Sequence, residues 1–463
     1  MLKPFFVRKI IYSSAVLASL FVQHTVSAQQ DYTLFNMQAV PQRMYANPAF
    51  RPTDTTIFIG LPVLSSEYLS FGNSGFKYSD LIRPDGDSLK ADVANMISKL
   101  AKENYISLAY HMDLLSFGFG LKKNYFSFNA TERVELRFGY SKDFFNFLWL
   151  GNGDPSTLGQ PVNLAPSLNI IHYREYGFGW SRHINDKLTV GGKLKYLYGE
   201  ENVSTGNTNA SLTTDPNDFA LTGQANIDIN TAGVGSNSFN NFNVMNYLFK
   251  KKNGGAAIDL GGTYKYTDNI TFSASLTDLG FITWNTDVTN YESHTANASF
   301  TYNGIDLDQF INNKSLNFGT VMQKTGDSAA KIFKIDTLHH TYTTMLTAQM
   351  YLGANYLFPW SGNAAILLHG EIYDKALHPS LTLSYNQTVG RWLTASIDYS
   401  IYNRSYNNIG FGMAHNLGPV QLYIVSDNVL GFLQPQNAQN IMFHFGINIS
   451  WVHKRPAQKK AQL

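Results

Sequence analysis

The chain has 463 residues, with 35 Lys and Arg against 33 Asp and Glu, and no cysteine. The lack of cysteine excludes disulfides, cysteine-ligated zinc and iron–sulfur sites, cysteine nucleophiles and acylation on cysteine. The near balance of charge excludes the broad basic surface that would indicate nucleic acid as a partner.

Residues 1–28 have the pattern of a secretory signal peptide. Three basic residues precede an apolar core at residues 10–22, and small residues lead up to Ala28. The core is too short for a membrane-spanning helix, which needs about 20 apolar residues. Without those three basic residues the chain carries 32 Lys and Arg (35 − 3) against 33 Asp and Glu. The sequence therefore predicts an exported protein whose signal is cleaved.

Residues 29–54 are predicted to form an extended N-terminal segment. They include Pro41, Pro48 and Pro52, and a residue that precedes proline avoids the helical region of backbone space. We therefore expect this segment to be extended and punctuated by turns.

Two short helices are expected in the rest of the chain. After a first strand at about residues 55–63, Asp87 is a candidate N-cap residue, with Leu89 and Val93 at helical spacing behind it. Residues 144–150 form an apolar run without strand alternation, which predicts a helix packed against or inside the fold. The alternative for this second helix is a position on the membrane surface.

Most of the remaining chain alternates between apolar and polar residues. Between residues 441 and 451 every odd position is apolar, whereas the even positions from His444 to Ser450 are His, Gly, Asn and Ser. Successive side chains of a strand point to opposite faces, so such a segment has one apolar and one polar face. A water-soluble β-sandwich has the same pattern. The signal peptide, the lack of cysteine and the abundance of aromatic residues and glycine favour a β-barrel in an outer membrane.

The faces are clearest in the strand expected at residues 393–401. Ile397 and Tyr399 should face lipid, and Ser396 and Asp398 should face the lumen. An arginine in place of Ile397 is then expected to cost about 2–4 kcal/mol, whereas an arginine in place of Ser396 is expected to be tolerated.

The predicted fold is all-β, a transmembrane antiparallel up-and-down β-barrel of about 14–16 strands with one or two short helices. A strand of about 10 residues tilted near 45° spans about 24 Å, close to the apolar band of such barrels. Short links at residues 389–391 and 402–404 force neighbouring strands to be antiparallel. The barrel is expected over residues 55–453, with polar loops such as 200–217 and 284–294 on one side. A basic tail follows at residues 454–463.

Three segments near the N-terminus resemble known families. Residues 36–42, 47–52 and 75–82 are similar to a family of outer-membrane barrels catalogued as a domain of unknown function. Asn47-Pro48-Ala49 also resembles the PorP/SprF barrels associated with the type IX secretion system. The resemblance implies an outer-membrane barrel over nearly the whole mature chain, and neither family supplies catalytic residues to carry over.

No catalytic, cofactor-binding or metal-binding set emerges from the sequence. The Gly-x-Ser-x-Gly elbow of serine hydrolases is absent. Charged and histidine residues on the polar faces are the candidates for a site, either as a hydrated, charge-balanced barrel interior or as a polar ligand path. In the second case, His369 and Glu371 could form a proton-sensitive gate. The candidates are His111, Asp113, Lys193, Lys195, Asp259, Lys265, His369, Glu371, Asp398 and His444.

The sequence thus favours a non-enzymatic protein of the bacterial outer membrane without a cofactor. It would be a porin-like transport channel for a small-molecule solute or a structural partner of secretion or surface-assembly proteins, with outer-membrane lipid around it. The alternatives are an outer-membrane enzyme that acts on lipid or glycan and a secreted, soluble β-sandwich that binds a ligand.

Overall fold

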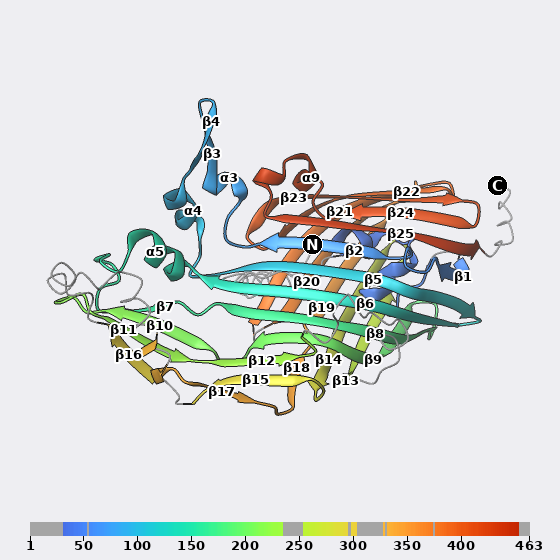
Figure 1. Ribbon diagram of the computed structural model, residues 1–463. Helices are drawn as coiled ribbons and strands as arrows, with labels where there is room; N and C mark the ends of the chain where they lie inside the picture. The colour runs from blue at the N-terminus through green and yellow to red at the C-terminus, as the bar shows by residue number, and fades with distance from the viewer. Residues whose placement is uncertain are drawn as a thin grey trace, which may run out of the picture.

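The computed structural model describes residues 31–52, 55–234, 253–294, 298–302, 327–328, 331–373 and 376–452. The predicted signal peptide and basic tail lie outside the described residues. The dominant feature of the described chain is one long antiparallel sheet that curls into a barrel (Figure 1).

The barrel wall is an up-and-down meander that closes on itself. Successive strands pair antiparallel, and the last strand, β25, pairs with β1 and β2, which in turn pair with β5. Ile59, for example, lies opposite Ile449 on one side and Phe117 on the other. The described strands occupy 14 positions around the barrel, because β1 with β2, β12 with β13, β14 with β15, and β17 with β18 and β19 share positions. The predicted transmembrane antiparallel β-barrel is confirmed.

The wall strands have the following bounds: β1 (Thr55–Gly60), β2 (Glu67–Asn73), β5 (Glu103–Leu121), β6 (Asn124–Ser141), β8 (Ser167–His183), β9 (Leu188–Thr205), β12 (Asp228–Ala232), β13 (Asn253–Lys265), β14 (Ile270–Trp284), β15 (Val288–Ser293), β17 (Ile335–Leu338), β18 (Tyr342–Met345), β19 (Ala348–Leu357), β20 (Gly362–Tyr373), β21 (Ala376–Val389), β22 (Leu393–Tyr402), β23 (Ser405–Leu417), β24 (Val420–Ser426) and β25 (Asn440–Val452).

Alternation along the strands places apolar side chains outside and polar side chains inside. On β22, Ile397 and Tyr399 are exposed, whereas Ser396, Asp398 and Ser400 are buried. The face assignment made for this strand is therefore correct. An outer surface of this kind suits contact with lipid.

The two ends of the barrel differ. β1 begins and β25 ends at the end where tight turns join β5 to β6, β13 to β14 and β23 to β24. The other end carries the longer connections and the small elements, at the top and left of Figure 1. Because outer-membrane barrels have short periplasmic turns and longer extracellular loops, we call these the periplasmic and the extracellular end.

The small elements at the extracellular end are α3 (Tyr78–Leu81), β3 (Ile82–Asp85), β4 (Ser88–Ala91), α4 (Val93–Lys99), α5 (Lys142–Leu150), β7 (Pro161–Asn163), β10 (Asn209–Thr214), β11 (Leu221–Asn226), β16 (Ala298–Tyr302), α9 (Leu430–Leu433) and η3 (Pro435–Asn437). None of the helices within the described part of the chain is long and apolar enough to cross a membrane.

Several local predictions are corrected here. Asp87 lies in the tight turn of the β3–β4 hairpin, and Asp92, not Asp87, caps α4 by accepting a hydrogen bond from the backbone N–H of Asn95. α5 has no buried residue and lies at the extracellular end, so its expected place inside the fold is wrong. The loops expected at 200–217 and 284–294 contain strand, because β9 continues to Thr205 and β10 and β15 follow.

The N-terminal residues 31–51, which we call the plug, lie inside the barrel. The expected extended conformation is wrong for the two helical turns α2 (Tyr32–Asn36) and η1 (Pro41–Tyr45). Almost every residue from 31 to 50 is buried. Two apolar clusters join the plug to the inner wall, one with Leu34, Met37 and Val40 against Tyr68, Val425 and Met442, the other with Phe35 and Phe50 against Tyr351 and Leu367. A further buried cluster around Leu197, Ile282 and Trp284 contains no plug residue.

Candidate functional site

The start of the plug is held by two aspartates of the wall region. Asp427, directly after β24, accepts hydrogen bonds from the backbone N–H groups of Tyr32 (3.1 Å) and Thr33 (2.9 Å). These are the free donors of the first turn of α2, so the carboxylate satisfies groups that the helix cannot satisfy itself. The Thr33 hydroxyl lies 2.5 Å from an oxygen of Asp398 on β22 and 2.7 Å from Asp427. α2 is therefore fastened to one side of the lumen.

The second half of the plug is held by other strands of the wall. The amides of Gln42 and Asn448 on β25 bond each other reciprocally, at 2.9 and 3.0 Å. The Tyr45 hydroxyl donates to Asp113 on β5 at 2.6 Å, and the hydroxyl of Ser275 on β14 donates to the backbone carbonyl of Ala46 at 2.6 Å. The plug thus bridges strands from several sides of the barrel.

Next to the plug, ion pairs between β6, β8, β9, β13 and β14 fill part of the lumen. Lys195 lies 2.8 Å from Asp259 and 2.6 Å from Asp278, and Arg133 lies 3.1 Å from Glu175. These groups are buried, so the carboxylates and cations neutralise each other away from bulk water. The network has three cations and three carboxylates, namely Arg133, Lys193, Lys195, Glu175, Asp259 and Asp278.

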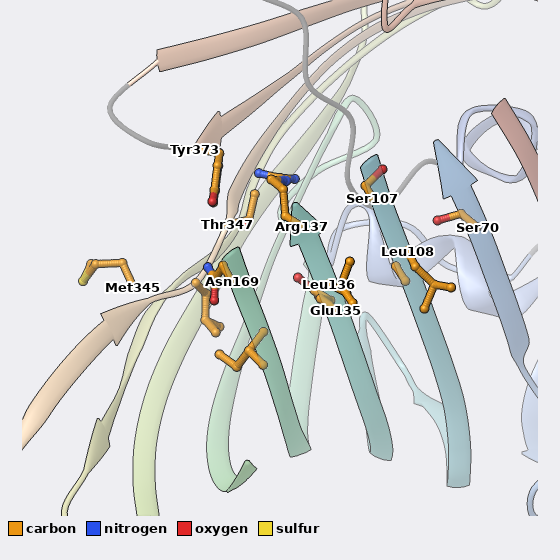
Figure 2. A pocket seen from close by; sticks show the side chains of 13 residues that line it. Ser70, Ser107, Leu108, Glu135, Leu136, Arg137, Asn169, Met345, Thr347 and Tyr373 are labelled. Carbon is orange, nitrogen blue, oxygen red and sulfur yellow. The ribbon is translucent and has the colours of Figure 1, made fainter. Parts of the chain in front are cut away.

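A second group of side chains fills the lumen nearer the extracellular end. Arg137 on β6 crosses the lumen to Glu371 on β20, with 3.2 Å between Nη2 and Oε1. Its guanidinium also lies over the ring of Tyr373, 3.7 Å from the ring centroid. Figure 2 shows Arg137 beside Tyr373 at a cavity whose lining also includes Ser107 and Asn169. The contact narrows the lumen from side to side.

Of the candidate lumen residues, nine lie buried on the inner side of the wall, and Lys265 does not. Lys265 is about half exposed and pairs with Asp268 in the periplasmic turn, 2.8 Å away. His369 lies against Tyr32 of the plug, with ring centroids 5.4 Å apart, while Glu371 pairs with Arg137. The buried nine are His111, Asp113, Lys193, Lys195, Asp259, His369, Glu371, Asp398 and His444.

The structure brings several of these residues to the plug. Asp113, Asp398 and His444 bond Tyr45, Thr33 and Asp31 respectively. Sequence reasoning missed Arg133, Arg137, Glu175 and Asp278, the partners that complete the ion pairs. The run Thr131-Glu132-Arg133 is polar at consecutive positions, so alternation gives no face for Arg133. The sequence pattern also could not show that the plug residues lie inside the barrel.

The sequence matches the model of a protein family described as a family of unknown function (DUF5723) over residues 48–427. No curated protein matches the chain. Among solved structures, the barrel is similar to a FadL homologue from Pseudomonas aeruginosa, at 9% identity over 93% of this chain and 100% of that chain, with a TM-score of 0.42.

Two further solved barrels are similar to this one. The toluene transporter TbuX from Ralstonia pickettii has 11% identity over 89% of this chain and 94% of that chain, with a TM-score of 0.39. The translocator domain of the autotransporter NalP from Neisseria meningitidis has 9% identity over 95% of this chain and 98% of that chain, with a TM-score of 0.31. At such low identity, these likenesses assign no ligand to this chain.

Proposed function

The chain belongs to the DUF5723 family of unknown function, as its sequence predicted, and we propose that it is a non-enzymatic channel of the bacterial outer membrane. In this proposal, its own N-terminal plug holds the lumen closed. The solute is a small molecule, and passage requires the plug to move.

The observation that carries this proposal is how the plug is attached. Many of its polar contacts with the wall are hydrogen bonds of amides, hydroxyls and carboxylates, such as Gln42 with Asn448 and Tyr45 with Asp113, and Asp31 also pairs with His444. Each such bond contributes about 1 kcal/mol net, because water can replace the partner once the plug moves. The plug contributes no strand to the sheet, so its release would leave the strand pairing of the barrel intact.

Cavities on the two sides of the plug support a path along the barrel. One lies beside Arg137 and Tyr373 near the extracellular end. Another lies between the plug and the wall near the periplasmic end, where Arg51 bonds the carbonyl of Lys123 in the turn between β5 and β6. The plug and the ion pairs beside it separate the two cavities, so the closed barrel has the arrangement of an interrupted path.

A second candidate function is that of a structural partner in secretion or surface assembly, as the PorP/SprF resemblance implies. It is favoured by α5, whose Leu148, Trp149 and Leu150 are all more than half exposed at the extracellular end. Exposed apolar side chains of this kind mark protein or membrane contacts. In that case the plug would remain seated throughout.

A reversible lock on the plug tests the channel proposal. The chain has no native cysteine, so Asn36→Cys with Ser384→Cys offers a single disulfide that fastens α2 to β21, where the two native side chains bond at 3.0 Å. In vesicles that contain this variant, solutes of graded size should enter under reducing conditions, and entry should stop on oxidation. The control, Asn36→Ala with Ser384→Ala, loses the same hydrogen bond, and solutes should enter it equally in both redox states.

The outcomes separate the candidate functions. Entry that is equal in the oxidised and reduced states would overturn gating by the plug. No entry in any variant, together with a protein that co-purifies only while Leu148 and Trp149 are intact, would favour the partner role. Hydrolysis of lipid or glycan by the purified barrel would favour the enzyme alternative.

A further inference from the structure

Arg43, in the plug, is a buried cation without a counter-ion. It is 9% exposed, and its Nε has no hydrogen-bond partner. Its guanidinium lies over the ring of Phe50, whose centroid is 3.8 Å from the guanidinium carbon. Within the described residues, no carboxylate lies within ion-pair distance of Arg43. Burial without such a partner lowers the pKa of Arg43.

The arrangement contrasts with the rest of the lumen. Arg133, Arg137 and Lys195 each have a carboxylate within 3.2 Å. A buried charge is costly unless it is paired, and leaving one partner out costs several kcal/mol in measured cases. The missing partner of Arg43 is therefore an acceptor that the described wall does not supply.

Arg43 lines an open cavity of about 260 Å³ between the plug and the periplasmic half of β8, β9, β13, β14 and β19. Arg51 lines the same cavity and bonds only neutral groups there, the hydroxyl and carbonyl of Ser181 and the carbonyl of Lys123. The polar lining also includes Asn36, Asn355 and His183, and no Asp or Glu is part of it.

We propose that this cavity is a binding site for a single oxyanion, a carboxylate or phosphate group, held by Arg43 and Arg51 and reached from the periplasmic end. Guanidinium groups bind both kinds of anion through paired N–H donors. The rings of Phe35 and Phe50 line the same cavity and give an apolar side to the site. The anion comes either as a free small ion or as the head of an amphiphile, and these sources share the contact with arginine.

The site does not depend on the transport proposal, because a static barrel could hold the anion equally well. Binding without solute entry would leave this site standing and remove the channel. Solute entry without anion binding would support the channel and overturn the anion site.

Calorimetric titration of the full chain in a non-ionic detergent tests the site. The probes are inorganic phosphate, acetate, octanoate and the neutral octanol. We expect an anion to bind once per barrel, and we expect Arg43→Met to weaken binding by about tenfold or more. Arg43→Lys should keep part of the affinity, since it keeps the charge but loses the paired donors. Arg83→Met, at an exposed arginine of the β3–β4 hairpin, is the control and should bind as the original chain does.

The probes distinguish the two sources of the anion. Binding of phosphate or acetate supports a free ion, whereas binding of octanoate alone supports the head of an amphiphile. Octanol that binds as tightly as octanoate, or no binding of any anion, would overturn the proposal. If Arg43→Met cannot be titrated, thermal unfolding gives a second measurement. The anion should raise the unfolding temperature of the original chain and not that of Arg43→Met.

Discussion

Arg137 on β6 and Glu371 on β20 form an ion pair across the lumen, with β8, β9, β13, β14 and β19 between their strands along the wall. Both side chains are buried, and the pair joins opposite sides of the barrel. The contact therefore holds the extracellular half of the lumen narrow, independently of the plug below it.

Removing one partner of this pair should destabilise the barrel. Arg137→Ala leaves Glu371 buried without its cation, which costs about 3–5 kcal/mol in comparable buried pairs. The control is the surface pair of Arg83 on β3 and Asp92, which follows β4, and Arg83→Ala should cost at most about 1 kcal/mol. Urea unfolding in vesicles, followed by tryptophan fluorescence, measures both. Equal losses of unfolding free energy in the two variants would show that the cross-lumen pair stabilises the barrel no more than a surface pair does.

Breaking the ion pairs beside the plug should also destabilise the barrel. Lys195 lies within 3 Å of both Asp259 and Asp278, so Lys195→Met leaves two carboxylates facing each other. We expect a loss of at least about 3 kcal/mol. Lys265→Met, which removes the exposed partner of Asp268, should have almost no effect. The folded fraction on unboiled gels at increasing urea compares the two variants. If Lys195→Met stays folded at the same urea concentrations as the original chain, the ion-pair network does not stabilise the barrel.

On β22, arginine should be harmful on both faces. Ile397→Arg puts a charge on the lipid side and should cost about 2–4 kcal/mol. The structure changes the expectation for Ser396, because this side chain is only 2% exposed in a filled lumen, and Ser396→Arg should overpack the lumen. Ile397→Leu and Ser396→Ala are the controls and should fold normally. Yield of the heat-modifiable form gives the readout, and full tolerance of Ser396→Arg would indicate an empty lumen.

Loss of the Asp427 carboxylate should loosen the plug and spare the wall. Asp427→Ala removes the acceptor of the N–H groups of Tyr32 and Thr33, each worth about 1 kcal/mol. Hydrogen exchange should then rise in residues 32–37 and stay slow in β25. Asp268→Ala, in a periplasmic turn, is the control and should leave both regions unchanged. Unaltered exchange at α2 in Asp427→Ala would contradict the anchoring role.

The sequence predicts the wall well, because a strand between lipid and lumen must alternate. β22 and β25 illustrate this, with Ile397 and Trp451 outside and Asp398 and His444 inside. Lys265 shows the limit of the same rule. It has the parity of a lumen residue, but it lies beside the periplasmic turn, where the inner face opens to solvent.

The plug could not be predicted, because its burial depends on contacts with distant parts of the chain. Tyr32 bonds Asp427, 395 residues away, and Gln42 bonds Asn448, 406 residues away. The local sequence reveals prolines and many apolar residues, but not what those residues contact. The cross-lumen pair of Arg137 and Glu371 is hidden for the same reason, since it depends on which strands face each other in the closed barrel.

Crosslinking in native outer membranes tests most directly whether the N-terminal segment fills the lumen. Asn36 of the plug lies 3.0 Å from the hydroxyl of Ser384 on β21, whereas the neighbouring Leu383 is half exposed on the outer face. Asn36→Cys with Ser384→Cys should form an intramolecular disulfide on mild oxidation, and Asn36→Cys with Leu383→Cys should not. No disulfide in the first pair, or equal disulfide in both, would contradict a plugged barrel.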